Sequence, residues 1–406
     1  MFGQSGGPTA VINASSCGVF EEALKHKEIT EVYGLKNGIK GILKEEFYDI
    51  KREDLEELKF LKNTPSSAIG SVRYKLKPFA EEPDDYYKIL EVFKKYNVRY
   101  FFYNGGNDSM DTCNKISKFL KSVDYECRVI GIPKTIDNDL VGTDHCPGYG
   151  SAAKYVATSV MELYEDTHVY TTQTVTVVEV MGRNAGWLTA AASLSKLTSS
   201  GADLIYLPEV VFSVDEFISD VQNVLNEKGN CLVIVSEGIK GSDGKYISEY
   251  QLSRKQDSFG HQQLGGLGLY LAGIVFERLH VKVRPIEFSL LQRCAAHLAS
   301  QTDIDEAYMV GKKAVEFSLN GASDVMVGMN RRPGKTYAID YVEVPLEKVA
   351  NLEKKIPEDW FTEDKKGVNE KFIDYVLPLI QGEAKHPTRN GLPRYASLKK
   401  MLVTKK

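Results

Sequence analysis

Short runs of apolar and β-branched residues recur along the chain, and each ends at glycine, proline, serine or another turn-forming residue. The clearest runs cover residues 98–104, 128–132, 175–180, 203–207 and 231–235. Because these runs are continuously apolar rather than alternating, they predict strands that are buried on both faces, as in parallel sheets covered by helices. Helical patterns lie between them, so the chain predicts a doubly wound α/β architecture.

One of the intervening helices has clear start and stop signals. Ser213 and Glu216 have the spacing of a capping box, in which each side chain bonds an otherwise unpaired amide at the helix start. Apolar residues then recur at helical spacing from Phe217 to Leu225. Gly229 is suited to end this helix with a left-handed conformation.

Length and composition indicate a globular protein of two or three domains. The chain has 406 residues, 51 Lys and Arg, 55 Asp and Glu, and a net charge of −4. We predict domains at residues 1–145 and 146–335, followed by a helical segment at 336–406 that packs back on the core.

Composition also excludes several classes of partner. No apolar run reaches the ~20 residues that span a membrane, and no basic cluster indicates nucleic-acid binding. The six cysteines are widely spaced, and the N-terminus has neither the basic nor the apolar region of a leader peptide. We therefore expect reduced thiols and a cytoplasmic location.

The turns after the predicted strands hold the candidate chemistry, because ligands of open α/β sheets bind beyond the carboxyl ends of strands. Residues 5–9 include Gly6 and Gly7 and lead into a helix, so their amides suit an anion. A tight turn without a ligand is the alternative. This loop begins almost at Met1, so we expect either a shortened first strand, which would leave a neighbouring strand unpaired and lower stability, or a misassigned start of the sequence.

A second glycine turn, residues 105–109, follows the run at 98–104. Asn107 and Asp108 offer oxygens that would hold Mg²⁺ directly or through water. The alternative is that they cap the following helix.

The turn at residues 133–139 is the most specific. It places Asp137 and Asp139 two residues apart, beside Lys134 and Thr135. One carboxylate is suited to accept a hydroxyl proton and the other to serve a metal, while the ammonium neutralises charge on a transferring phosphoryl group. A plain aspartate and asparagine turn is the alternative.

Further polar residues follow later strands. Arg183 comes directly after the run at 175–180, and Glu237 after the run at 231–235; Arg284 and Arg293 lie further along. Arginines suit a sugar phosphate and a glutamate suits a sugar hydroxyl. Read singly, each of these residues favours a structural role over a functional one.

In this order the motifs resemble the phosphofructokinase family, and in particular its pyrophosphate-dependent members. The resemblance covers nearly the whole chain, and residues 133–139 and 181–183 are its most specific parts. It implies two Rossmann-like domains with mainly parallel sheets, and an active site between them at the strand carboxyl ends. Residues 1–145 are then expected to bind the phosphoryl donor and Mg²⁺, and residues 146–335 to bind the sugar phosphate. It also implies reversible phosphoryl transfer from pyrophosphate to the 1-hydroxyl of fructose 6-phosphate, with Mg²⁺, in a homodimer or homotetramer.

The resemblance assigns Asp137 as the base that takes the proton of the sugar hydroxyl, with Lys134 stabilising the transferring group. It places Asn107 and Asp139 near the metal. Asn107 departs from the family pattern, because ATP-using members have an aspartate at this position, so its contact with the metal is expected to be indirect.

Binding roles are likewise implied by the resemblance. Gly7 and Arg73 correspond to contacts of the phosphoryl donor, and Arg284 to a residue that reaches across from a neighbouring subunit. The positions that correspond to sugar-phosphate contacts are Thr135, Ile136, Asp137, Met181, Gly182, Arg183, Glu237, Arg284 and Arg293. Leu290 and Thr174 depart from the pattern, since many members have a histidine at the first position and some have an arginine at the second.

Two residues are expected to select the donor, because ATP-using members resemble this chain but have glycine in place of Asp108 and Lys134. A carboxylate at Asp108 occupies the space of a nucleotide α-phosphate and repels its charge, whereas Lys134 attracts pyrophosphate. Such contacts are worth several kcal/mol at an effective dielectric of ~20. The alternatives are use of ATP, use of sedoheptulose 7-phosphate, and a non-catalytic regulatory subunit.

Overall fold

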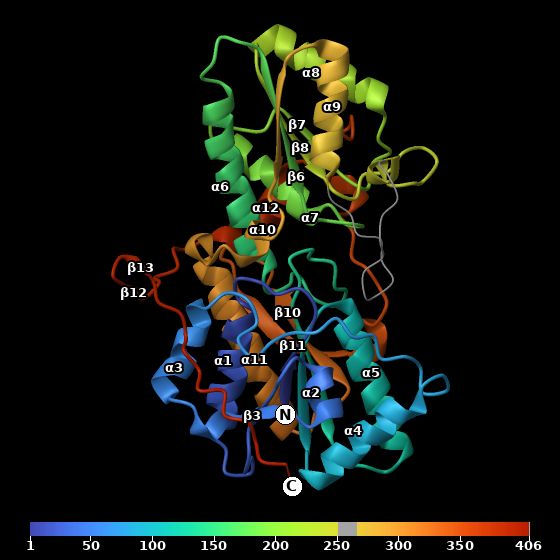
Figure 1. The fold of residues 1–406 in the computed structure, drawn as a ribbon, viewed down its shortest axis with the longest axis vertical. Coiled ribbons are helices and arrows are strands. Elements are labelled where there is room, and N and C mark those ends of the chain that lie inside the picture. The colour runs from blue at the N-terminus through green and yellow to red at the C-terminus, as the bar shows by residue number, and fades with distance from the viewer. Residues whose placement is uncertain (251–265, 406) are drawn as a thin grey trace.

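The computed structural model describes residues 1–250 and 266–405, which form two lobes along the long axis of the molecule (Figure 1). Each lobe contains one main β-sheet. The strands of the larger sheet are β1 (Phe2–Gln4), β2 (Tyr33–Leu35), β3 (Phe47–Asp49), β4 (Tyr100–Gly105), β5 (Arg128–Pro133), β10 (Val325–Arg331) and β11 (Ile339–Pro345). Those of the smaller sheet are β6 (Thr174–Val180), β7 (Leu204–Tyr206), β8 (Cys231–Ser236) and β9 (Lys282–Glu287).

Helices cover both sheets. The α-helices are α1 (Ile12–Ala23), α2 (Ile39–Lys44), α3 (Leu55–Phe60), α4 (Pro83–Lys95), α5 (Asn107–Ser122), α6 (Tyr149–Thr167), α7 (Trp187–Ala190), α8 (Val214–Lys228), α9 (Leu267–Leu279), α10 (Leu291–Cys294), α11 (Gln301–Leu319) and α12 (Glu370–Val376). A short hairpin of β12 (Thr388–Arg389) and β13 (Leu392–Pro393) lies near the C-terminus. No helix among the described residues is long and apolar enough to cross a membrane.

The larger sheet has the order β11-β10-β5-β4-β1-β2-β3, and only its two edge strands pair antiparallel to their neighbours. Successive side chains of a strand point to opposite faces. On β4, Phe102 packs in the cluster formed with α1 and α11, whereas Phe101 and Tyr103 pack in the cluster formed with α4 and α5. Both faces are therefore buried, as the continuous apolar pattern predicts.

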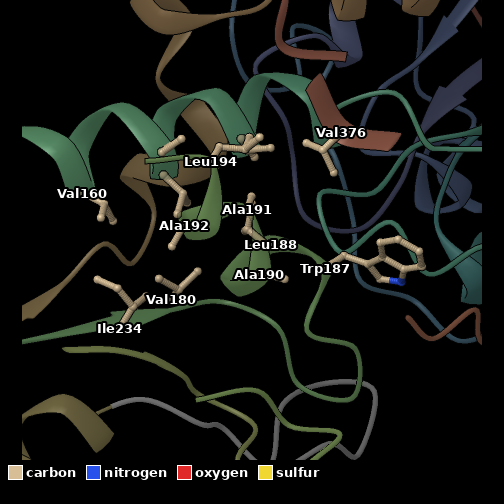
Figure 2. Close-up of a cluster of buried hydrophobic side chains, with 14 of the residues drawn as sticks. Val160, Val180, Trp187, Leu188, Ala190, Ala191, Ala192, Leu194, Ile234 and Val376 are labelled. Atoms are coloured by element: carbon tan, nitrogen blue, oxygen red, sulfur yellow. The ribbon is translucent and has the colours of Figure 1, made fainter. Parts of the chain in front are cut away.

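The smaller sheet has the order β7-β8-β6-β9 and is parallel throughout. Val177 faces the cluster with α8 and α9, and its neighbour Val178 faces the cluster with α6. Figure 2 shows the second cluster, in which Val160 of α6 lies above Val180 and Ile234 of the sheet. The doubly wound α/β architecture and its mainly parallel sheets are thus confirmed.

The predicted strands are also confirmed, as is the Ser213 bond of the predicted capping box. Each of the five apolar runs contains a parallel strand, β4 to β8. Helix α8 begins after Ser213, whose Oγ accepts a hydrogen bond from the amide of Glu216 at 3.4 Å. It ends at Gly229, which has a φ of 82°.

Two expectations need correction. Strand β1 is short, but it pairs with β4 over its three residues and with β2 at Phe2, so its neighbours are not left unpaired. The sheets also do not divide at residues 145 and 335, because α11, β10 and β11 belong to the first lobe. Strand β10 pairs with β5 across almost 200 positions, a contact that local hydrophobic patterns do not reveal.

The C-terminal segment also differs from the prediction of a helical region. Residues 336–405 contain β11, the hairpin and a single α-helix, α12, and much of the remainder is irregular. The segment does pack back on the core: the backbone of Asp49 and Phe47 bonds Met401 and Val403. The assignment of functions to separate domains stays a prediction.

Candidate active site

A cleft of about 1120 Å³ lies between the two lobes. Its walls come from the turns that follow β1, β4, β5, β6 and β8, so it opens at the carboxyl ends of the parallel strands. Sites for one small molecule commonly measure ~300–1,000 Å³. The cleft therefore has room for two ligands side by side.

The first wall is the glycine loop after β1. Gly6 has a φ of 75°, a conformation that side chains disfavour, and its amide bonds the carbonyl of Val72 at 3.0 Å. A Cβ added to Gly7 would lie 2.9 Å from Nη1 of Arg293 and 4.0 Å from Arg73. The absence of a side chain at Gly7 thus allows two guanidinium groups to approach the loop.

Lys134 forms the floor beside this loop. Its Nζ donates a 2.7 Å hydrogen bond to the carbonyl of Gly7, and the side chain is buried. Burial lowers the pKa of Lys134 to about 8, while Asp137 opposes the shift. A cation so poorly hydrated is suited to contact an anion that enters the cleft.

The second wall is the start of α5. Asn107 does not cap the helix, which begins after Gly106 without a side-chain cap; instead its Nδ2 donates to Oδ2 of Asp139 at 3.1 Å. Oδ1 of Asn107 is buried and has no hydrogen-bond partner. The capping alternative is therefore wrong for Asn107. Asp108 also lines the cleft.

Asn107 and Asp139 fit a divalent metal ion. The unpartnered amide oxygen and the neighbouring carboxylate are the hard oxygen ligands that Mg²⁺ prefers. Within the described part of the chain, no group of three or more histidine, cysteine, aspartate or glutamate residues is arranged to hold a metal. An ion held here would thus need further oxygens from a phosphate ligand or water.

The turn after β5 brings both candidate acids to the centre of the cleft. The backbone amide of Asp137 donates a 3.0 Å hydrogen bond to the side-chain Oγ1 of Thr135, which fixes this turn. Burial and the charge of Glu237 raise the pKa of Asp137, whereas the positive charge of Lys134 lowers it and offsets part of the rise. Burial and the charge of Asp137 likewise raise the pKa of Asp139.

The opposite wall belongs to the second lobe. Gly182 follows β6 with a φ of 140°, and its amide donates to Oε1 of Glu237 at 3.3 Å. The amide of Met181 donates to Oε1 of Gln292 at 3.1 Å. Burial raises the pKa of Glu237. The strand ends of β6 and β8 are thereby joined into one polar surface that includes Arg183.

The structure brings nearly all predicted residues to this one cleft. The lining includes Gly7, Arg73, Asn107, Asp108, Lys134, Thr135, Ile136, Asp137, Asp139, Met181, Arg183, Glu237 and Arg293. Gly182 lies just behind the wall, bonded to Glu237. Arg284 is outside the cleft: it lies on the edge strand β9 and its Nη1 donates to Asp166 at 2.9 Å.

Several lining residues were not predicted. Lys75 and Asn184 sit close to motif residues in the sequence, and proximity to those motifs was the available signal. Asn351, Leu352 and Glu353 come from the C-terminal segment, where no motif marks them. Nδ2 of Asn184 donates to Oε1 of Glu353 at 2.9 Å, so that segment meets the second lobe at the cleft.

Two mainly parallel sheets that present glycine turns, cations and paired carboxylates to a shared cleft define an α/β enzyme of phosphoryl transfer. The chain belongs to the phosphofructokinase family, whose model matches residues 1–317. Members of this family generally use a divalent metal ion.

Similar proteins agree with this assignment. The pyrophosphate–fructose 6-phosphate 1-phosphotransferases of Methylococcus capsulatus and Halomonas elongata are 44% and 43% identical, and each alignment covers 100% of this chain and 97% of the relative. The crystal structure of the pyrophosphate-dependent phosphofructokinase from Marinobacter aquaeolei is 40% identical. It superposes with a TM-score of 0.89 over 100% of this chain and 97% of that one.

Proposed function

We propose that the chain transfers a phosphoryl group from pyrophosphate to the 1-hydroxyl of fructose 6-phosphate, giving fructose 1,6-bisphosphate and orthophosphate. The observation that carries this proposal is the placement of Lys134 and Asp108 with Asp137 around one cleft. The relatives that are 43–44% identical over 97% of their length bear the name of this activity.

The acceptor half of the reaction centres on Asp137. Its half-buried carboxylate, whose pKa is raised, accepts the proton as the sugar oxygen forms its bond to phosphorus. Glu237 and Arg183, on the wall formed by the second lobe, bind the sugar phosphate. The base and the sugar therefore meet where the two lobes face each other.

The donor half centres on the glycine loop. Lys134 and Arg73 hold the pyrophosphate against Gly7, and the leaving orthophosphate departs with the electron pair of the broken anhydride bond. Mg²⁺ held by Asn107 and Asp139 would neutralise negative charge on the donor. The Asp108 carboxylate disfavours an α-phosphate, so pyrophosphate is preferred to ATP.

Arg293 lies close to the glycine loop, although the resemblance assigns it to the sugar phosphate. Its guanidinium lies against Gly7 of this donor loop. Burial lowers the pKa of Arg293, with the charge of Arg73 adding to the effect. We propose that Arg293 contacts the sugar phosphate from a position between the two ligands.

We also propose that the protein is a homodimer or homotetramer. Arg284 lies on β9, an edge strand of the smaller sheet as far as the described residues show, and it is not part of the lining of the cleft. The adjoining helix α9 exposes Leu269 and Phe276, which are 62% and 61% accessible. A second copy of the chain on this face would bury both side chains and offer Arg284 to a neighbouring cleft. Light scattering after size-exclusion chromatography measures the mass of the assembly and so tests this proposal.

A cytoplasmic location remains part of the proposal. All six cysteines carry free thiols, and four of them are buried, which fits a reducing compartment. Fractionation of the source cells tests the location.

The deciding experiment for the reaction compares donors. Purified protein is supplied with fructose 6-phosphate and Mg²⁺, and fructose 1,6-bisphosphate is measured with pyrophosphate or with ATP. Turnover with pyrophosphate alone supports the proposal. Turnover with ATP overturns the donor assignment, and faster turnover with sedoheptulose 7-phosphate overturns the sugar. A folded protein that turns over neither donor indicates a regulatory subunit.

A further inference from the structure

Lys354 contacts the base-bearing turn although it lies beyond residue 317, where the matched family region ends. Its amide donates to the carbonyl of Asp139 at 2.7 Å. Its Nζ donates to the carbonyl of Asp144 at 2.6 Å and to that of Thr143 at 3.4 Å. One residue therefore holds the chain at both ends of the stretch that follows the base.

Lys354 also contacts the second lobe. Its carbonyl accepts a 2.9 Å hydrogen bond from Nε1 of Trp187, at the start of α7. Its Nζ lies 5.0 Å from the centre of the Trp187 ring, within the range of a cation–π contact. Figure 2 shows Trp187 at the edge of the second lobe's core.

Tyr375 of α12 makes a matching pair of contacts. Its hydroxyl donates to the carbonyl of Asp144 at 2.6 Å and accepts from Nδ2 of Asn138 at 2.8 Å. Asn138 lies between the two acidic residues and has a φ of 54°, in the left-handed region. Its Oδ1 in turn accepts from the amide of Cys146 at 3.0 Å.

From these contacts we propose that Lys354 and Tyr375, here called the C-terminal clamp, are positioning residues for the base Asp137. Neither residue lines the cleft, so the clamp holds residues 138–144 without touching substrate. This inference rests on the proposed function, because that function assigns Asp137 as the base.

The clamp would act by fixing the geometry of the turn at Asn138. The left-handed turn at Asn138 costs free energy unless its surroundings hold it, and the hydroxyl of Tyr375 supplies such a contact. Displacing a reacting group by about 1 Å can cost ~100-fold in rate. Most of the proposed substrate contacts come from other residues of the cleft, so the loss should appear mainly in kcat rather than in KM.

The test compares Lys354→Met with Lys354→Arg, and uses Lys355→Met as the matched control at an adjacent exposed lysine. Methionine keeps the aliphatic stem but cannot donate to the two carbonyls, whereas arginine can. We expect kcat to fall about 10- to 100-fold in Lys354→Met, with KM for both substrates within about threefold. Arginine should restore most of the rate, and the control should match the unmodified protein.

Tyr375→Phe provides a second variant, should Lys354→Met fail to fold. It deletes one hydroxyl and keeps the ring in the core, with Tyr395→Phe at an exposed tyrosine as its control. The same fall in kcat at constant KM is expected. A kcat within twofold of normal in folded variants overturns the clamp, as does a rise in KM at unchanged kcat.

Hydrogen–deuterium exchange separates this inference from the proposed function. The amides of residues 137–146 should exchange faster in both clamp variants than in the unmodified protein, and at an unchanged rate in both controls. This measurement does not require turnover. If the unmodified protein fails to use pyrophosphate, the proposed function fails, and the exchange rates still decide the clamp. Unchanged exchange in this stretch overturns it.

Discussion

Nζ of Lys134 donates a 2.7 Å hydrogen bond to the carbonyl of Gly7, which joins the turn after β5 to the glycine loop after β1. The contact puts a buried ammonium at the place where the glycine loop would receive the donor. Because burial lowers the pKa of Lys134 to about 8, its charge is sensitive to pH near neutrality.

We predict a bell-shaped dependence of kcat/KM on pH. Asp137 must be ionised to accept a proton, so activity falls as pH decreases through its raised pKa. Lys134 must be protonated, so activity falls again as pH rises through about 8. In Lys134→Arg the basic limb should move upward, since a guanidinium stays charged. An unchanged basic limb in this variant would assign that limb to another group.

Asp137→Asn should lower kcat by about 10²- to 10⁴-fold, because the amide has the same shape but cannot accept the proton. Binding of fructose 6-phosphate, measured by calorimetry, should persist. Asp374→Asn, at an exposed position of α12, is the matched control and should keep full activity. Near-normal turnover of Asp137→Asn would remove this residue from the role of base.

Donor choice should depend on Asp108 together with Lys134. Lys134→Gly alone should reduce kcat/KM for pyrophosphate by about 100-fold, since a buried cation is lost from the transition state. Adding Asp108→Gly should raise kcat/KM for ATP at least about tenfold, equal to ~1.4 kcal/mol of repulsion removed. Steady-state rates with each donor measure both effects. No gain with ATP in the double variant would show that Asp108 does not exclude the nucleotide.

The parts of the fold and of the cleft that depend on a local sequence pattern could be predicted from the sequence. Continuous apolar runs predict β4 to β8 because a parallel strand is buried on both faces, and Ser213 predicts the start of α8 because its spacing from Glu216 suits a cap. The glycine turn at residues 105–109 and the acidic turn at residues 133–139 meet because they follow β4 and β5, neighbouring parallel strands whose carboxyl ends lie at the same edge of the sheet.

Other features depend on contacts between distant parts of the chain. The pairing of β10 with β5 has no local signal, so the domain boundaries were misplaced. Asparagine is a residue type that often caps helices, but the side-chain amide of Asn107 bonds Asp139 instead, because the fold brings the two residues close together. Lys354 lies in a segment without a motif, and only the fold brings it to the base-bearing turn.

The tightest contact between α1 and α11 leads to a prediction about stability. A Cβ added to Gly18 would lie 2.1 Å from the carbonyl oxygen of Tyr308, and one added to Gly311 would lie 2.0 Å from that of Ser15. Both neighbours are backbone atoms within helices and cannot move aside as a flexible side chain could. Gly18→Ala and Gly311→Ala should therefore each lower the free energy of unfolding by about 1–3 kcal/mol, although alanine favours helices.

Urea titration of each variant measures this change. Asp305→Ala, at an exposed position of α11, should stay within about 0.5 kcal/mol of the unmodified protein. The two glycine substitutions act on one contact, so combining them should cost less than the sum of the single effects, because the first already separates the helices. Stabilisation by either alanine would mean that α1 and α11 lie further apart than the backbone contacts at these glycines require.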